Sequence, residues 1–156
     1  MKNFLRNQFI AYTASLCLFA GAYAQTARVQ IIHNSADLAA ENVDVYVNGG
    51  LFLDDFAFRT ATPFTDVPAD VNLSIAVAPS NSTSVNDAIA TFNVNFTNGE
   101  TYVVVANGIV SSTGYLPNVP FNLHVFPLGR ETSGNANETD VLVFHGATDA
   151  PTVDVV

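Results

Sequence analysis

Short apolar runs rich in Val, Ile, Phe, Tyr and Thr recur between turn residues, and after residue 24 none of them shows a sustained helical period. This pattern predicts an all-β chain. The expected strands cover residues 28–33, 43–47, 51–56, 60–65, 72–78, 89–96, 102–107, 122–126 and 141–145.

The alternation of apolar and polar positions predicts which strand faces are buried. In residues 72–77 the apolar set is Leu73, Ile75 and Val77, which leaves the other face in water, whereas residues 102–106 are apolar on both parities, as in a central strand. The run Asn48-Gly49-Gly50 favours a tight hairpin turn. About nine strands without helices favour an immunoglobulin-like antiparallel β-sandwich, with a small β-barrel as the alternative.

A pattern near the start of the chain returns near its end. Residues 29–37 (VQIIHNSAD), followed by Val-Asp-Val at 43–45, reappear as residues 141–149 (VLVFHGATD), followed by Val-Asp-Val at 153–155. The repeat predicts a module over residues 26–130, a linker over 131–138 and the start of a second, truncated repeat over 139–156. We therefore expect the natural protein to continue beyond Val156.

The first residues have the composition of a secretory signal peptide. Lys2 and Arg6 precede a largely apolar stretch, and Ala22-Tyr23-Ala24 before Gln25 matches a small-x-small cleavage site, so residues 1–24 are expected to be removed. The apolar stretch is too short to span a bilayer, and no transmembrane segment is expected elsewhere. The sequence thus predicts a secreted, extracellular or cell-surface protein.

Charge and cysteine content narrow the class further. Cleavage would leave three arginines, Arg28, Arg59 and Arg130, against fourteen carboxylates, a net charge of −11, and no cysteine, because Cys17 lies in the removed segment. Such a surface repels nucleic acid, so nucleic-acid binding is set aside. Without disulfides, the stability must come from an apolar core.

Several separated pieces resemble, in order, the domain of unknown function 4397 family. They are residues 27–37, the Val-Asp-Val-Tyr strand with its Asn-Gly turn at 43–49, Val-Pro-Ala at 67–69 and residues 99–108. The first loop departs from the family pattern, because residues 38–42 make it two residues longer than in the second copy. The resemblance implies secreted or surface-exposed β-sandwich modules, mostly bacterial and often in tandem, and it implies no established reaction.

His33, Asp37 and Asp44, with counterparts His145, Asp149 and Asp154, are the polar residues that recur. A histidine and carboxylates converging at a strand end could bind a divalent cation or form an acid–base pair. A structural role is favoured. His33 ends the apolar stripe of Val29 and Ile31, where its ring nitrogens can fix the next loop, and Asp37 can cap backbone amides in a turn. No metal or other cofactor is therefore expected.

After residue 24 the chain has no cysteine and no Gly-x-Ser-x-Gly nucleophile elbow, so an enzyme is not expected. The favoured function is a non-enzymatic module of a tandem surface protein with a structural or adhesive role. The alternatives are a ligand-binding module for carbohydrate or peptide, for which aromatic residues such as Phe52 and Phe56 could form a platform, and a metal-dependent hydrolase. The partner is not identified; other surface proteins or glycans are the candidates.

Overall fold

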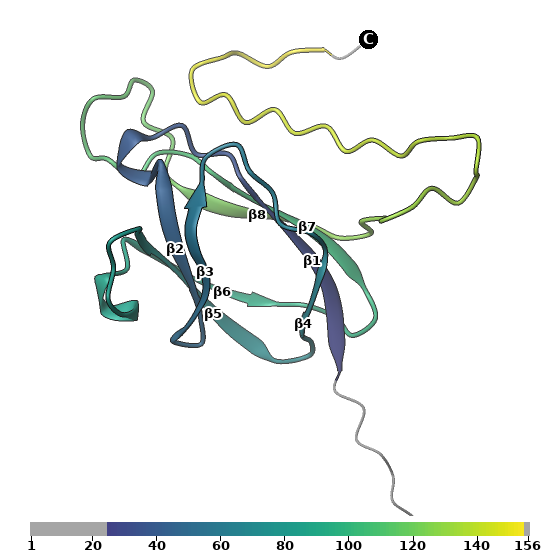
Figure 1. Ribbon diagram of the computed structural model, residues 1–156. Helices are drawn as coiled ribbons and strands as arrows, with labels where there is room; N and C mark the ends of the chain where they lie inside the picture. The colour runs from purple at the N-terminus through teal and green to yellow at the C-terminus, as the bar shows by residue number, and fades with distance from the viewer. Residues whose placement is uncertain (1–24, 155–156) are drawn as a thin grey trace, which may run out of the picture.

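The computed structural model describes residues 25–154 and contains two four-stranded sheets packed face to face (Figure 1). The predicted signal peptide lies outside the described residues. The elements are β1 (Thr26–His33), η1 (Leu38–Ala40), β2 (Asn42–Val47), β3 (Gly50–Ala57), β4 (Thr65–Pro68), β5 (Asn72–Pro79), η2 (Val85–Asp87), β6 (Ala90–Asn95), β7 (Thr101–Asn107) and β8 (Asn122–Phe126), where η marks a 3₁₀ helix.

The first sheet has the strand order β4-β1-β7-β8 and the second has β3-β2-β5-β6, so the β-sandwich prediction is confirmed and the strands do not close into a barrel. Most neighbouring strands run antiparallel. β1 and β7 run parallel, with Arg28 opposite Thr101 and His33 opposite Ala106, a pairing that the strand pattern did not indicate. Within residues 25–154, no helix is long and apolar enough to cross a membrane.

Between the sheets, alternate residues of each strand form the core. Leu73, Ile75 and Val77 of β5 face inward and are buried, as the alternation predicts. The opposite face of β5 was expected to be wet, and there the prediction is wrong: Ala76 and Ala78 are also buried. They pack with Tyr46 of β2 under residues of the loop around η2, which covers this outer face.

The hairpin at residues 48 and 49 forms as predicted. Asn48 and Gly49 both have positive φ, and they make the two-residue connection between β2 and β3. This backbone twist matches the right-handed twist of the flanking strands.

One predicted strand is shifted along the chain, and another is not observed among the described residues. The strand expected at residues 60–65 begins only at Thr65. Residues 59–62 already bond to the end of β1, with a single bridge between Ala61 and Ile32, but Pro63 has no amide to continue the ladder. Residues 141–145 form no strand, although they repeat the sequence of β1. β1 is held between two partners, β4 and β7, whereas residues 141–145 pair with no strand among the described residues.

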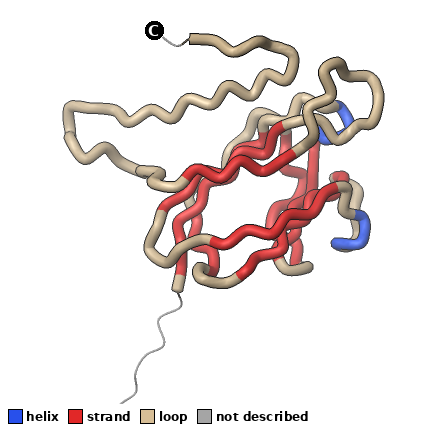
Figure 2. Tube along the Cα trace, turned by 180° about the vertical axis from the view of Figure 1, so that it is seen from behind, coloured by secondary structure: helices blue, strands red, loops and turns tan. Residues whose placement is uncertain are grey.

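The segment that carries the second copy instead packs on the outside of the first sheet. Residues 127–154 contain no strand and run past the sandwich in extended form, yellow-green to yellow in Figure 1 and tan in Figure 2. The ring of Phe144 lies 5.1 Å from that of His124 and 5.8 Å from that of Phe126, both on β8. A Cβ added at Gly146 would meet the side chains of Asn34 and Phe144, which would have to shift.

Position 108, just after β7, requires glycine both for its backbone conformation and for lack of space. Its φ is +102°, and a Cβ there would clash with the Pro120 carbonyl and lie 2.8 Å from the Cα of Phe121. Gly114 provides a contrast, because its φ of +94° is similar but its Cβ would meet open space.

Gly108→Ala should therefore lower the free energy of unfolding by more than Gly114→Ala does. Backbone strain alone costs about 1 kcal/mol at each site, and we expect about 2 kcal/mol or more of additional loss at Gly108 from the clash with backbone atoms. Urea unfolding of the two variants measures the difference. Equal losses would show that the backbone around residues 108–121 is not packed as described.

Candidate functional site

His33 is the last residue of β1, and its ring is buried at the end of the core (1% exposed). Nε2 lies 2.7 Å from the Ala40 carbonyl oxygen, and the Ser35 amide donates to Nδ1 at 3.4 Å. Because Nδ1 accepts, this pattern assigns the neutral tautomer with its proton on Nε2. The predicted role of His33 in fixing the next loop is confirmed.

The surroundings of His33 favour its neutral form. The rings of Phe56 and Phe58 lie 5.7 and 6.1 Å from the imidazole. Burial lowers the pKa of His33 below its usual range, although the bond to the Ala40 carbonyl opposes this shift. The imidazole is thus held as a neutral donor to the loop.

Asp37 caps η1 and is equally buried (1% exposed). Oδ1 accepts from the Ala39 amide at 2.9 Å and from Ser111 Oγ at 2.8 Å; Oδ2 accepts from the amides of Val110 at 2.9 Å and Ser111 at 2.6 Å. A carboxylate has about four lone-pair positions. All four are occupied, so Asp37 has no free position for a metal ion.

These hydrogen bonds set the charge state of Asp37. Burial by itself would raise the pKa of this carboxyl, but the donors from Ser111, Ala39 and Val110 outweigh it and hold the pKa below its usual range. Asp37 is therefore a buried anion stabilised by four donors. Three of those donors come from residues 110 and 111, more than 70 positions away in sequence.

Ser35 adds a second link between the same two loops. Its buried hydroxyl donates to the Gly108 carbonyl at 2.6 Å, and the Asn34 amide donates to the Ala106 carbonyl at 2.8 Å. We call the contacts between the first loop (residues 34–41) and residues 106–111 the loop junction. It closes one end of the sandwich.

Asp44 belongs to a different part of the molecule. It lies on β2 between the inward-facing Val43 and Val45, so its side chain shares the outer face of the second sheet with Tyr46. Its oxygens accept from the Asp55 amide at 3.1 Å and from Ser82 Oγ at 2.5 Å. Since the Ser82 proton is used there, the Tyr46 hydroxyl donates to Ser82 at 2.8 Å.

The three predicted site residues thus do not converge. His33 and Asp37 share the loop junction, and Asp44 anchors the loop over the second sheet. Within residues 25–154, no three His, Cys, Asp or Glu side chains are grouped as a metal site would need, and no buried polar side-chain atom lacks a hydrogen-bond partner. The arrangement required by the metal or acid–base hypothesis is therefore not formed by these residues.

The second copy reproduces one bond of the loop junction. His145 Nε2 lies 3.0 Å from the Pro151 carbonyl oxygen, on an exposed segment. The position of Ser35 is taken by Ala147, and Asp149 is exposed. The histidine-to-carbonyl bond is thus local to the repeated motif, whereas the rest of the junction depends on the loop after β7.

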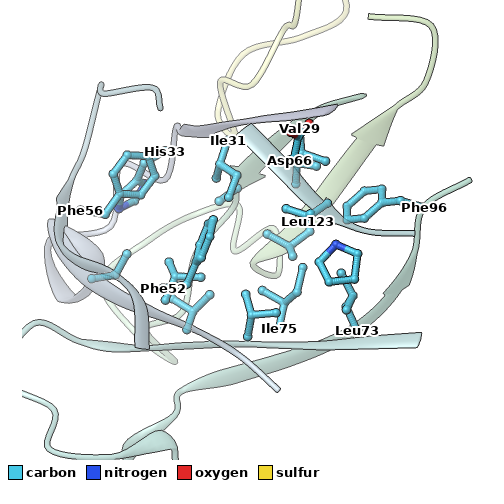
Figure 3. Close-up of a pocket in the computed structure, with 18 of the residues that line it drawn as sticks. Val29, Ile31, His33, Phe52, Phe56, Asp66, Leu73, Ile75, Phe96 and Leu123 are labelled. Atoms are coloured by element: carbon cyan, nitrogen blue, oxygen red, sulfur yellow. The ribbon is translucent and has the colours of Figure 1, made fainter. Parts of the chain in front are cut away.

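Sequence reasoning missed the partners of these residues. Three serines make these contacts: Ser111 bonds to Asp37, Ser82 to Asp44, and Ser35 to the Gly108 carbonyl. An isolated serine in a loop does not reveal its hydrogen-bond partner in the sequence. The sequence also gave no sign of an apolar cavity of about 130 Å³ between the sheets (Figure 3). A cavity of this size costs about 3 kcal/mol of stability relative to a filled core.

These features define the molecule as a β-sandwich domain with a buried polar junction at one end and an apolar cavity inside. The chain matches the family model described as Domain of unknown function (DUF4397) over residues 27–156, and it belongs to that family. Comparison with curated proteins found no match.

The neutral state of His33 predicts a pH dependence of stability. Because the folded state lowers its pKa, the unfolded chain takes up the proton first as pH falls below about 6.5. The free energy of unfolding should therefore decrease below pH 6.5, with a slope approaching about 1.4 kcal/mol per pH unit until the folded-state pKa is reached. Urea unfolding of the protein between pH 7.5 and 5 measures this loss.

His33→Gln, which keeps a donor for the Ala40 carbonyl, should remove this part of the pH dependence. His145→Gln is the matched control from the second copy, and it should retain the slope because His145 is exposed. If His33→Gln and the unmodified protein show the same slope from pH 6.5 to 5, His33 is not held neutral in the folded state.

Proposed function

We propose that this chain is an exported, non-enzymatic β-sandwich module with a structural or adhesive role in a tandem cell-surface or extracellular protein of a bacterium. The proposal is supported mainly by the hydrogen bonds of the recurring polar residues, which hold loops in place. The nitrogens of His33 and the oxygens of Asp37 are committed to backbone groups and Ser111. Groups with no remaining hydrogen-bond capacity hold loops and are poorly suited to bind or transform a substrate.

The sequence outside the loop junction supports the same proposal. The basic start, apolar stretch and Ala22-Tyr23-Ala24 motif have the order of an export signal. The signature of the first strand and loop recurs at residues 141–155, as in chains built from successive modules. The acidic surface with three arginines after residue 24 favours solubility in an extracellular setting.

The proposal is tested by expressing the full chain in a bacterium with a general secretion pathway. We expect the product outside the cytoplasm, with Gln25 as its N-terminal residue by mass spectrometry. Ala24→Phe is the control, because a large residue at the cleavage position blocks processing. An unprocessed chain retained in the cytoplasm would contradict the export part of the proposal.

The same purified product tests the non-enzymatic part. Panels of ester, glycoside, phosphate and peptide substrates, each with and without divalent cations, should give no turnover above background. A turnover that His33→Gln abolishes while His145→Gln retains it would overturn the proposal. Circular dichroism of both variants shows whether they remain folded.

A further inference from the structure

The interior cavity lies between the two sheets, and its walls come from both. Val29, Ile31 and Val104 line it from the first sheet, and Val45, Leu73 and Ile75 line it from the second. Figure 3 shows the ring of Phe52 among these side chains, with His33 and Phe56 towards one end and Phe96 towards the other. The surface of the cavity is almost entirely carbon.

The cavity meets solvent on one side. Among its lining residues, Phe52 is 37% exposed and lies on β3, an edge strand of the second sheet. Facing it across the cavity is Val67 of β4, an edge strand of the first sheet, whose neighbours Asp66 and Pro68 are exposed on the outer face. The side of the cavity nearest to solvent is therefore the side where Phe52 lies.

The polar groups near the cavity are already paired. His33 uses both ring nitrogens for the Ala40 carbonyl and the Ser35 amide, and the Asp66 carboxylate accepts from Arg28 at 3.5 Å. A water molecule inside a protein needs two to four polar partners. The lining does not supply them, so the cavity is suited to an apolar occupant.

We propose that the core of this sandwich binds a small apolar molecule of about the size of benzene. A cavity of about 130 Å³ is close to the volume at which an engineered cavity lined by Leu, Ile and Phe binds benzene, roughly 150 Å³. The partly exposed ring of Phe52 lies on the solvent side of the site. This binding goes beyond the proposed structural role and does not depend on it.

The first test uses benzene and phenol, which differ by one hydroxyl. Benzene at ten times its dissociation constant should raise the Tm of the purified protein by about 4 °C. It should also shift the methyl NMR signals of Val29, Ile31, Val45 and Leu73. Phenol should bind at least tenfold more weakly, since its hydroxyl would find no free partner inside. Equal effects of benzene and phenol, or no effect of benzene, would overturn the proposal.

The second test fills the site. Val45→Phe places a ring in the cavity and should abolish the benzene-induced Tm shift. Leu51→Phe is the matched control on the neighbouring β3, because Leu51 is exposed and does not line the cavity; it should retain the shift. If Val45→Phe does not fold, Val104→Ile, which adds one methylene, should still weaken benzene binding. Unchanged binding in the folded cavity variants would place the ligand elsewhere and overturn the proposal.

Discussion

The buried carboxylate of Asp37 is the constraint on which this end of the molecule depends. A charge removed from water must be compensated by close donors, or the fold loses several kcal/mol. Asp37 obtains four, three of them from residues 110 and 111. The loop after β1 and the loop after β7 must therefore meet, which is possible because β1 and β7 are parallel neighbours whose ends lie together.

Two further residues of the loop junction are constrained by their own contacts. Gly108 must lack a side chain because the backbone of Pro120 and Phe121 approaches it. His33 is the last residue of the apolar face of β1. Its neutral ring packs at the end of the core and bonds through Nε2 to the Ala40 carbonyl of the polar loop. The polar groups at this end of the sandwich are hydrogen-bonded to one another. The interior between the sheets contains apolar side chains and the cavity.

Much of the sandwich could be predicted from the sequence because strand alternation depends on local residues. It identified the inward face of β5, the doubly buried β7 and the turn at Asn48. It failed where the environment is set by distant parts of the chain. The outer face of β5 is buried by the loop around η2, and residues 141–145 form no strand because they have no neighbouring strand to pair with among the described residues.

The candidate site also has features that could be predicted from local sequence and features that depend on distant residues. The interpretation of His33 as a loop-fixing residue rested on its place at the end of an apolar stripe, and the structure confirms it. The metal and acid–base alternatives required Asp44 to converge with His33 and Asp37, whereas its carboxylate bonds to the Asp55 amide and to Ser82 over the second sheet. The partners of Asp37 could not be predicted, because no local pattern links Asp37 to Ser111 across 74 positions.

Native-state hydrogen exchange at the amides of Val110 and Ser111 tests the central claim most directly. If Asp37 holds the loop junction together, these two amides exchange only through global unfolding, as slowly as the amide of Val77 in β5. Asp37→Asn should then let both exchange through local opening while Val77 stays protected. Exchange of Val110 and Ser111 in the unmodified protein at the rate of exposed loop amides would contradict the account.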